Sequence, residues 1–144
     1  MSSVDITDNS AEFKAALEQA AARALEIIGG KIESYAKGLA PEHTGALKNS
    51  ITHAVDGDTV FAGSAIKYAP YVELGTGKEY QPPPEWMQNN APRGRGLDKW
   101  YYRDELTGEW RVGLPQKPRP YLRPAVENHL EEYKNIIDSE LKNA

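Results

Sequence analysis

Apolar residues recur at steps of three and four from Phe13 to Leu39, and this pattern constrains the fold more than any other feature of the chain. The spacing predicts one apolar stripe along a long α-helix. Asn9, with Glu12 three positions later, has the spacing of an N-terminal capping box. The glycine pair at 29–30 predicts either a soft point in one long helix or two collinear helical pieces, because glycine is a poor helix former. Pro41 predicts the end of the helix.

A β-hairpin is predicted next. The β-rich segments 50–55 and 59–63 flank Asp56-Gly57, a dipeptide that favours a tight turn between two strands. The run 68–73 then predicts a short helix or turn that ends at Gly75.

A second hairpin lies within residues 78–117, which are rich in proline and glycine and predict a long loop. The aromatic-rich segments 100–102 and 110–112 flank a turn that contains Thr107-Gly108. The sequence therefore predicts a mobile arm, 78–117, with a hairpin at its centre.

The end of the chain predicts another helix. Pro124 suits the first helical position, where its missing N–H costs nothing. The apolar stripe that would pack this helix on a sheet consists of Val126, Leu130, Tyr133, Ile137 and Leu141. The element order predicts a single α+β domain over residues 1–144. In it, a long N-terminal helix and a C-terminal helix pack on a small antiparallel sheet, and a long β-hairpin arm is inserted before the C-terminal helix.

Composition narrows the function classes. The chain has 144 residues and no cysteine, which excludes disulfides, thiolate metal sites and thiol nucleophiles. No apolar run is long enough for a membrane span, and the N-terminus lacks the basic head and apolar segment of a secretory signal. We therefore expect no membrane association, and a cytoplasmic location is allowed.

Charge is distributed unevenly along the chain. Residues 91–123 hold eight basic and four acidic side chains, a net charge of +4. The remainder holds nine basic and seventeen acidic side chains, a net charge of −8. This layout suits a protein whose surfaces meet different partners or other copies of itself, although an ordinary mixed surface is the alternative.

The stretch ELGTGKE at 73–79 resembles a phosphate-binding loop, but its spacing is wrong for one. The first glycine of G-x-x-x-x-G-K-[ST] falls on Val72, and the hydroxyl position falls on Glu79, whose carboxylate would repel phosphate. The sequence predicts no nucleotide site here, and no cofactor elsewhere.

The other catalytic patterns are equally incomplete. The run 64–67 matches S-x-x-K but lacks the partner motifs of serine acyl enzymes. The three histidines, His43, His53 and His129, lack metal-ligand spacing, so a structural role is predicted for each. We expect no catalytic residues and no metal site. The arm, in contrast, mixes cations with aromatic rings, a combination that can bind single-stranded nucleic acid. The arm residues expected to make contacts are Arg93, Arg95, Trp100, Tyr102 and Trp110.

Four further blocks occur in a fixed order. They are Pro41…Thr44-Gly45-x-Leu47-x-x-Ser50-Ile51, then Gly63, then Tyr68-Ala69-x-Tyr71-Val72-Glu73-x-Gly75-Thr76-Gly77, and finally Arg119-Pro120-Tyr121-Leu122-Arg123-Pro124-Ala125. With the variable insert before RPYLRPA, this series resembles the head–tail joining, or tail-completion, family of long-tailed bacteriophages. The resemblance spans most of the chain. It departs at Tyr121, where phenylalanine is common, and at Leu74, where an aromatic residue is often found.

The resemblance implies a small virion structural protein without catalysis. Such a protein would form a ring, hexameric in the assembled particle, at the neck where the tail meets the DNA-filled head. Its expected partners are further copies of itself, the tail terminator or tail tube, and head connector proteins, with DNA in the neck lumen as a further contact. Its location would be the virion neck or tail, and the host cytoplasm during assembly. The alternative function is a nucleic-acid-binding module that uses the basic aromatic arm.

The motif residues are expected to act chiefly through the fold. They are Thr44, Gly45, Tyr68, Tyr71, Glu73, Gly75, Thr76, Gly77, Arg119, Pro120, Tyr121, Arg123 and Pro124. Gly75 and Gly77 would let the chain turn sharply into the arm. Glu73 would accept a charge-assisted hydrogen bond from Arg119 or Arg123 and so clamp the two roots of the arm together.

Overall fold

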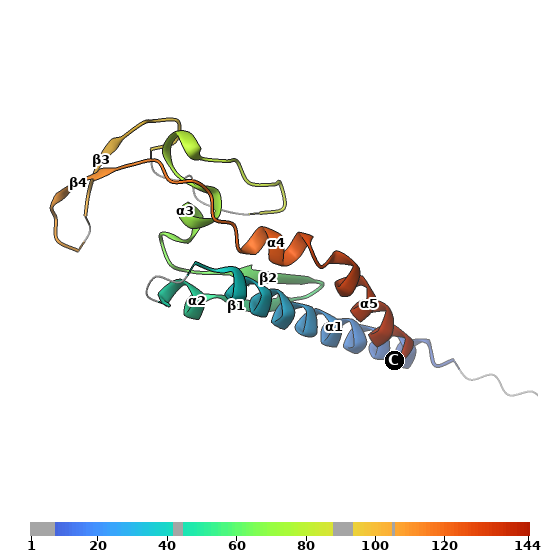
Figure 1. The fold of residues 1–144 in the computed structure, drawn as a ribbon. Helices are drawn as coiled ribbons and strands as arrows, with labels where there is room; N and C mark the ends of the chain where they lie inside the picture. Colours follow the sequence, from blue (N-terminus) through green and yellow to red (C-terminus); the bar gives the residue numbers. More distant parts are fainter. Residues whose placement is uncertain (1–7, 42–44, 88–93, 105) are drawn as a thin grey trace, which may run out of the picture.

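The computed structural model describes residues 8–41, 45–87, 94–104 and 106–144, and it has the predicted α+β architecture. Figure 1 shows an elongated molecule, with the second hairpin at one end and the C-terminus at the other. The elements are α1 (Ser10–Leu39), α2 (Ala46–Ser50), β1 (Thr52–Asp56), β2 (Thr59–Gly63), α3 (Ala69–Leu74), the 3-10 turn η1 (Gly77–Glu79), β3 (Trp100–Arg103), β4 (Trp110–Gly113), α4 (Leu122–Glu127) and α5 (Leu130–Lys142).

The helix α1 is continuous through its two glycines, so the chain forms one long helix and not two collinear pieces. Gly29 is buried, and a Cβ atom built on it would lie 2.5 Å from Cδ2 of His53 on β1. A Cβ atom on Gly30 would meet nothing within 4 Å. Gly29 therefore lets the hairpin approach the helix closely, a tertiary role that outweighs its low helix propensity.

The predicted capping box at the start of α1 is also wrong. Asn9 occupies the N-cap position but makes no side-chain cap hydrogen bond. Instead, the backbone N–H of Ser10 donates to Oδ1 of Asp8 at 2.9 Å. A carboxylate is favourable there because it lies at the positive end of the helix dipole.

The first hairpin forms where the sequence predicts it, with one shift in the turn. Asp56 pairs with Thr59, so the two-residue loop is Gly57-Asp58 and not Asp56-Gly57. Gly57 has φ 62°, and glycine at the first loop position suits a type II′ turn. His53 and Val55 alternate with exposed neighbours, which places them on the face that packs against α1.

The C-terminal helix differs from its prediction in three ways. It begins at Leu122, so Pro124 is its third residue, still within the first turn, where a backbone N–H has no intrahelical partner. It is interrupted at residues 128–129, between α4 and α5. Both helices pack chiefly on α1 and not on a sheet.

The interruption also rotates the buried face of this helix. Tyr133 is buried as predicted, but Leu130 is 59 % exposed. In its place the ring of His129 stacks on Tyr35 of α1, with centroids 3.6 Å apart and planes 3° from parallel. His129 thus has the structural role predicted for it.

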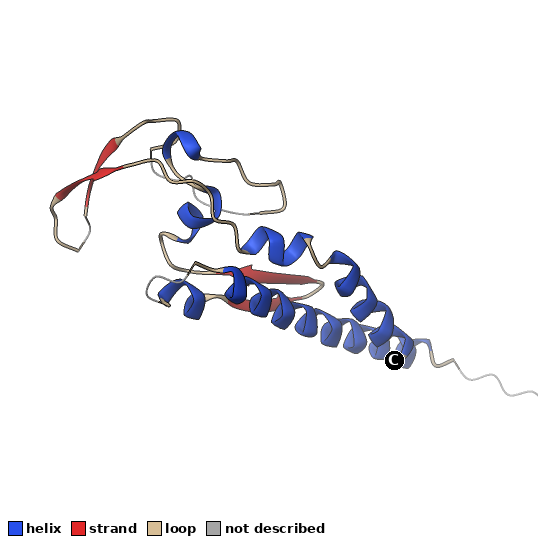
Figure 2. Cartoon of the chain, in the orientation of Figure 1, coloured by secondary structure: helices blue, strands red, loops and turns tan. Residues whose placement is uncertain are grey.

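The core lies around α1, between the first hairpin, α4 and the start of α5 (Figure 2). Its buried members are Ile28, Ile32, Ala36, Ala40, Leu47, Ile51, Ala69, Tyr121, Ala125 and Tyr133. β3 and β4 form a separate two-stranded sheet outside this core. The second hairpin is therefore held by the connections at its root, described next.

Candidate assembly site at the root and face of the arm

Glu73 is the centre of the arm's root. Its side chain is buried, with 4 % exposed, at the end of α3. Oε2 accepts hydrogen bonds from the backbone N–H groups of Tyr121 at 2.7 Å and Leu122 at 3.0 Å, and Oε1 accepts one from the N–H of Arg123 at 2.9 Å. These are N–H groups of the first turn of α4, which have no partner within the helix.

The predicted clamp is therefore present, but its predicted partners are wrong. Glu73 binds the backbone of residues 121–123 and not the guanidinium of Arg119 or Arg123. The side chain of Arg123 instead donates to Glu127 at 3.0 Å, on the exposed surface of α4. The backbone N–H of Arg119 donates to the carbonyl of Val72 at 2.7 Å, which adds a second link between the two roots.

Tyr121 packs beneath this clamp and is fully buried. Its hydroxyl donates to the carbonyl of Ala69 at 3.4 Å. Burial raises the pKa of the Tyr121 hydroxyl, and the nearby negative charge of Glu73 raises it further. The hydroxyl consequently stays protonated and keeps its role as a donor.

The Gly75-Thr76-Gly77 sequence is the point where the outgoing chain crosses the returning chain. Thr76 forms a bridge with Gln116: its N–H donates to the Gln116 carbonyl at 2.9 Å, and its Oγ1 accepts from the Gln116 N–H at 3.0 Å. Oγ1 also donates to the carbonyl of Leu114 at 3.2 Å. One buried threonine thus joins the segment that enters the arm to the segment that leaves it.

Both glycines are required by this crossing. Gly75 has φ 79°, and a Cβ atom on it would lie 2.7 Å from the Gln116 carbonyl oxygen. Gly77 has φ 59°, and its Cβ atom would lie 2.7 Å from the carbonyl oxygen of Leu97. The expected sharp turn is confirmed, and close approach of two backbones is a second reason for glycine.

Trp100 anchors the base of the hairpin and is not a projecting contact. Cβ atoms built on Gly94 and Gly113 would lie 2.0 Å and 2.2 Å from its indole ring, and one on Gly77 would lie 2.9 Å away. Three glycines thus make room for one large ring. Its Nε1 atom is buried and, among the described residues, has no hydrogen-bond partner.

The other face of the hairpin is exposed and largely apolar. In the antiparallel register Tyr101 lies opposite Val112, and Arg103 lies opposite Trp110, so these four side chains share a face. Trp110 is 72 % exposed, Tyr101 64 % and Val112 52 %. Leu114, two residues beyond Val112, is also exposed. We call Tyr101, Arg103, Trp110 and Val112 the arm face.

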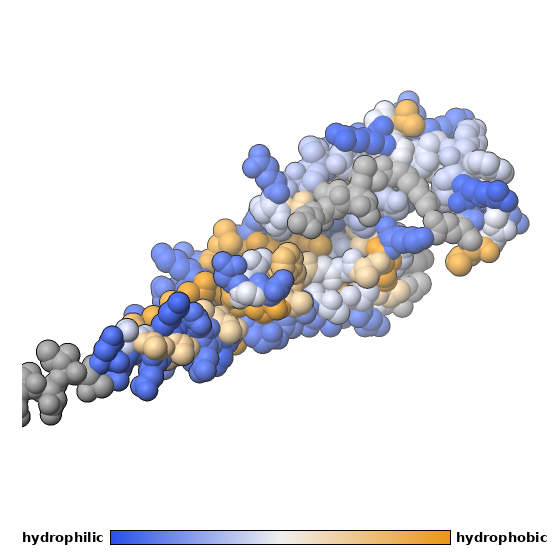
Figure 3. Space-filling view, turned by 180° about the vertical axis from the view of Figure 1, so that it is seen from behind, coloured by the Kyte–Doolittle hydropathy of each residue, from blue (hydrophilic) through white to orange (hydrophobic). Residues whose placement is uncertain are grey.

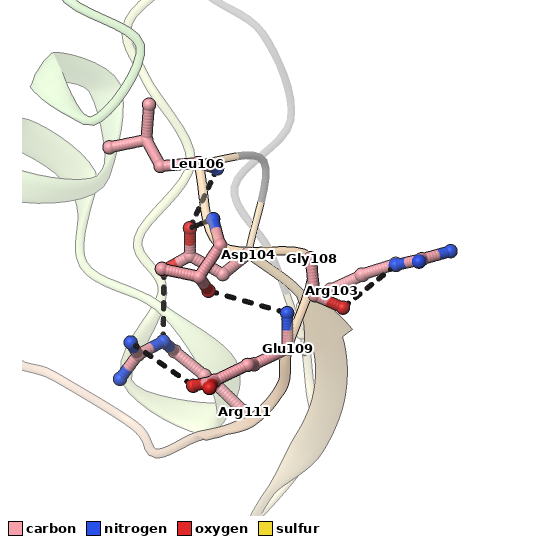
Figure 4. A network of polar contacts seen from close by, with 7 residues as sticks. Arg103, Asp104, Leu106, Gly108, Glu109 and Arg111 are labelled. Carbon is pink, nitrogen blue, oxygen red and sulfur yellow. Dashed lines mark hydrogen bonds and ion pairs between the residues drawn. The ribbon is translucent and has the colours of Figure 1, made fainter.

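A network of polar contacts links the described residues near the tip of the hairpin (Figure 4). Oδ1 of Asp104 accepts from the N–H groups of Leu106 at 2.8 Å and Thr107 at 3.1 Å, and Oδ2 accepts from Nε of Arg111 at 2.9 Å. The backbone hydrogen bonds, with help from Arg111, lower the pKa of Asp104. Arg103 donates through Nε to the Gly108 carbonyl, and its guanidinium points away from the hairpin.

An apolar groove lies in the core part of the molecule, at the free edge of β2. Its volume is about 390 Å³, and it separates β2 from α3, α4 and the loop that carries Trp86. Phe61 and Trp86 line it and are about half exposed. Figure 3 shows hydrophobic residues gathered over the middle of the molecule. We call this the β2 groove.

The remaining predicted residues fall into three groups. Thr44 and Arg93 lie outside the described residues. Gly45 has φ 77° and precedes α2, while Pro120 and Pro124 belong to the extended segment and first turn at α4, so these act through the backbone. Tyr68 is 42 % exposed, Tyr71 and Tyr102 are half-buried, and the guanidinium of Arg95 lies over the ring of Tyr80 at 4.9 Å.

Sequence analysis missed the β2 groove and part of the arm face. Phe61 carried a signal, because it is a large apolar residue on the solvent side of an alternating strand. Trp86, in the proline-rich loop, carried another. Tyr101 and Val112 lie in the predicted strand segments 100–102 and 110–112. The sequence does not show whether their face of the hairpin or the face that carries Trp100 is exposed.

Neither a metal site nor a membrane-spanning helix is found in the described part of the chain. It contains no group of three or more His, Asp or Glu side chains arranged to hold a metal ion. No helix within it has the length and apolar character needed to span a bilayer. Comparison with protein-family models, curated proteins and solved structures finds no match to this chain.

Proposed function

We propose that this chain is a structural protein of a phage virion that joins the tail to the head at the neck, without catalysis or a cofactor. The observation that carries the proposal is the arm: a hairpin with an exposed aromatic face, held on a small core by the Glu73 clamp. Five of the motif residues that carry the resemblance to the head–tail joining family lie at this root: Glu73, Gly75, Thr76, Gly77 and Tyr121. They fix the arm's direction, which an assembly protein needs when it meets a neighbour.

The expected partners follow from the same surface. An exposed aromatic and cationic face suits protein–protein contacts, in which Trp, Tyr and Arg are enriched. We propose that the chain forms a ring, hexameric in the particle, and contacts a tail terminator or tail tube on one side and a head connector on the other. DNA would pass through the neck lumen. The chain would be found in the virion neck and, during assembly, in the host cytoplasm.

The proposal is tested by removing the gene from the phage or prophage that encodes it. Electron microscopy should then show filled heads and tails that are separate, and supplying the full chain in trans should restore joined particles. Normal joined particles without the chain would contradict the proposal.

A second candidate function is nucleic-acid binding, favoured by Arg103 beside Trp110 on the arm face. It predicts an affinity that falls steeply with salt, because phosphate contacts release counterions. A gel-shift titration with single-stranded DNA at two salt concentrations separates this candidate from the first.

A further inference from the structure

His53 lies where the first hairpin meets the long helix, and its ring sits between two carboxylates of that helix. Glu26, Gly29 and Glu33 are spaced by three and four residues, so they lie along one face of α1. The ring of His53 occupies the space that Gly29 leaves on this face, because a Cβ atom there would lie 2.5 Å from Cδ2 of the ring. The side chain of His53 is 17 % exposed, so the contact is largely enclosed.

Each nitrogen of the ring faces a different carboxylate. Nε2 donates to Oε1 of Glu26 at 2.6 Å, and Nδ1 lies 3.5 Å from Oε1 of Glu33. Nδ1 is buried and has no hydrogen-bond partner in the described part of the chain. A neutral ring that donates to Glu26 would turn a lone pair toward Glu33, whereas an imidazolium turns an N–H toward both carboxylates. The geometry therefore suits the protonated ring.

The charges that act on this ring come from α1. The elements that pack chiefly on β1 are α1 and β2. β2 contains no ionisable residue, and Asp56 lies on the opposite face of β1 from His53. Lys37 lies 3.8 Å from the second oxygen of Glu33. The hydrogen bond to Glu26 raises the pKa of His53, burial opposes this rise, and Glu33 supports it.

The apolar contacts of the first hairpin are too limited to make this polar contact redundant. No residue of β1 or β2 is among the fully buried core residues, and Val60 and Ala62 are only partly buried against that core. In the register of the hairpin, Ala62 lies opposite His53. Val60 and Ala62 also line the β2 groove, so the strand that forms one wall of the groove pairs with the strand that carries His53.

We propose that His53 is a pH-sensitive switch: its protonated ring bridges Glu26 and Glu33 and holds the first hairpin on α1, and loss of the proton lets the hairpin open locally. In the open form the core formed by α1, α4 and α5 stays packed, and the β2 groove loses one wall. Local opening of this kind involves elements that bury few apolar side chains. The inference goes beyond the proposed function and does not depend on it.

NMR titration of the histidine ring protons tests the contact directly. The signal that disappears in His53→Gln identifies His53 among the three histidines of the chain. Its pKa should lie above 6.5, and Glu26→Gln and Glu33→Gln should each lower it. Glu12→Gln is the matched control: it removes a glutamate of the same helix, about 21 Å along the helix axis from Glu26, and should leave the pKa of His53 unchanged.

Hydrogen exchange measures the opening itself. The contact is fully formed below pH 6.5 and is lost as the pH rises through the raised folded-state pKa. Protection factors of the hydrogen-bonded amides in β1 and β2, corrected for the effect of pH on intrinsic exchange, should therefore fall between pH 5.5 and 8.5. A fall of about two- to fivefold is expected, because the Glu26 side chain is 65 % exposed. His53→Gln should remove this dependence on pH. Amides in β3 and β4, which form a separate sheet, are the internal control.

Three results would overturn the inference. The first is a His53 pKa at or below 6.5 that neither glutamine variant lowers. The second is protection of the first hairpin that does not change with pH. The third is exchange that accelerates equally in α4 and α5, because the whole fold and not the hairpin would then respond. Glu26→Gln keeps the ring and its packing on Gly29 and should show a smaller pH effect, so it decides the question even if His53→Gln does not fold.

Discussion

Replacement of Glu73 by glutamine tests how the arm is held to the core. Glutamine keeps the shape of the side chain but has one acceptor oxygen in place of two. If that oxygen keeps the bonds to the Tyr121 and Leu122 N–H groups, the amide nitrogen must face the N–H of Arg123, donor to donor. The variant therefore loses a charge-assisted bond and converts the other two to neutral ones.

The size of the effect follows from these contacts. A hydrogen bond to a charged group contributes about 1.5–3 kcal/mol, and the negative charge at a helix N-terminus contributes about 0.3–1 kcal/mol. We expect Glu73→Gln to lower the free energy of unfolding by about 2–4 kcal/mol. For a chain of this length that corresponds to a fall in Tm of roughly 7–13 °C. Glu73→Ala, which leaves all three N–H groups without the carboxylate, should cost more.

The assays are urea unfolding followed by circular dichroism, and limited proteolysis with mass spectrometry of the fragments. The matched control is Glu127→Gln, which removes an exposed i,i+4 pair with Arg123 and should change stability by no more than about 0.5 kcal/mol. Cleavage in the arm should become faster in the Glu73 variant only. Equal stability of the two variants, with equal protease resistance of the arm, would refute the clamp.

Three other predictions concern single features of the core and the arm. In urea titrations, Gly30→Ala should raise the free energy of unfolding by about 0.5–1 kcal/mol, because its Cβ atom enters open space within a helix. Gly29→Ala should lower the free energy of unfolding, because its Cβ atom would lie 2.5 Å from His53 Cδ2. Equal effects of the two substitutions would contradict the packing described. The His53 Nε2–Glu26 Oε1 contact at 2.6 Å raises the pKa of His53 above its usual 6.5. The stabilisation of the fold by this contact should therefore be complete below pH 6.5 and decline as the pH rises through the folded-state pKa. Tm measured from pH 5.5 to 8.5 should show this decline, and His53→Gln should remove it. Deletion of residues 79–116 should leave a folded core with cooperative unfolding, since the core and the Glu73 contacts lie outside the deleted segment, and a non-cooperative transition would contradict this.

The sequence was sufficient for the elements that depend on local patterns. The stripe from Phe13 to Leu39 predicted α1, and alternating segments with a Gly-containing turn predicted both hairpins. What it missed depends on tertiary contacts. Gly29 reads as a helix breaker until His53 is known to lie against it. The predicted stripe in the C-terminal helix holds at Val126 and Tyr133 but is wrong at Leu130, because the interruption at 128–129 turns His129 toward Tyr35 instead.

In the candidate site, too, the sequence revealed local features but not the tertiary partners of the residues. The sequence identified Glu73 as a clamp, and pairing it with an arginine was the natural choice because both are charged. The backbone N–H groups of residues 121–123 became its partners because a helix begins there, and a helix N-terminus offers several donors in one direction. Trp100 was expected to be one of the contact residues of the arm, but its ring lies against Gly94 and Gly113 within the arm, which no local pattern reveals.

The most direct test of the central claim, that a clamped arm joins this protein to its neighbours in the particle, is a count of joined particles by electron microscopy. Particles would be made without the native gene and supplied with either the full chain or the chain lacking residues 79–116. The account predicts joined particles with the full chain, and separate heads and tails with the armless chain, even though its core is folded. Equal numbers of joined particles in the two samples would contradict it.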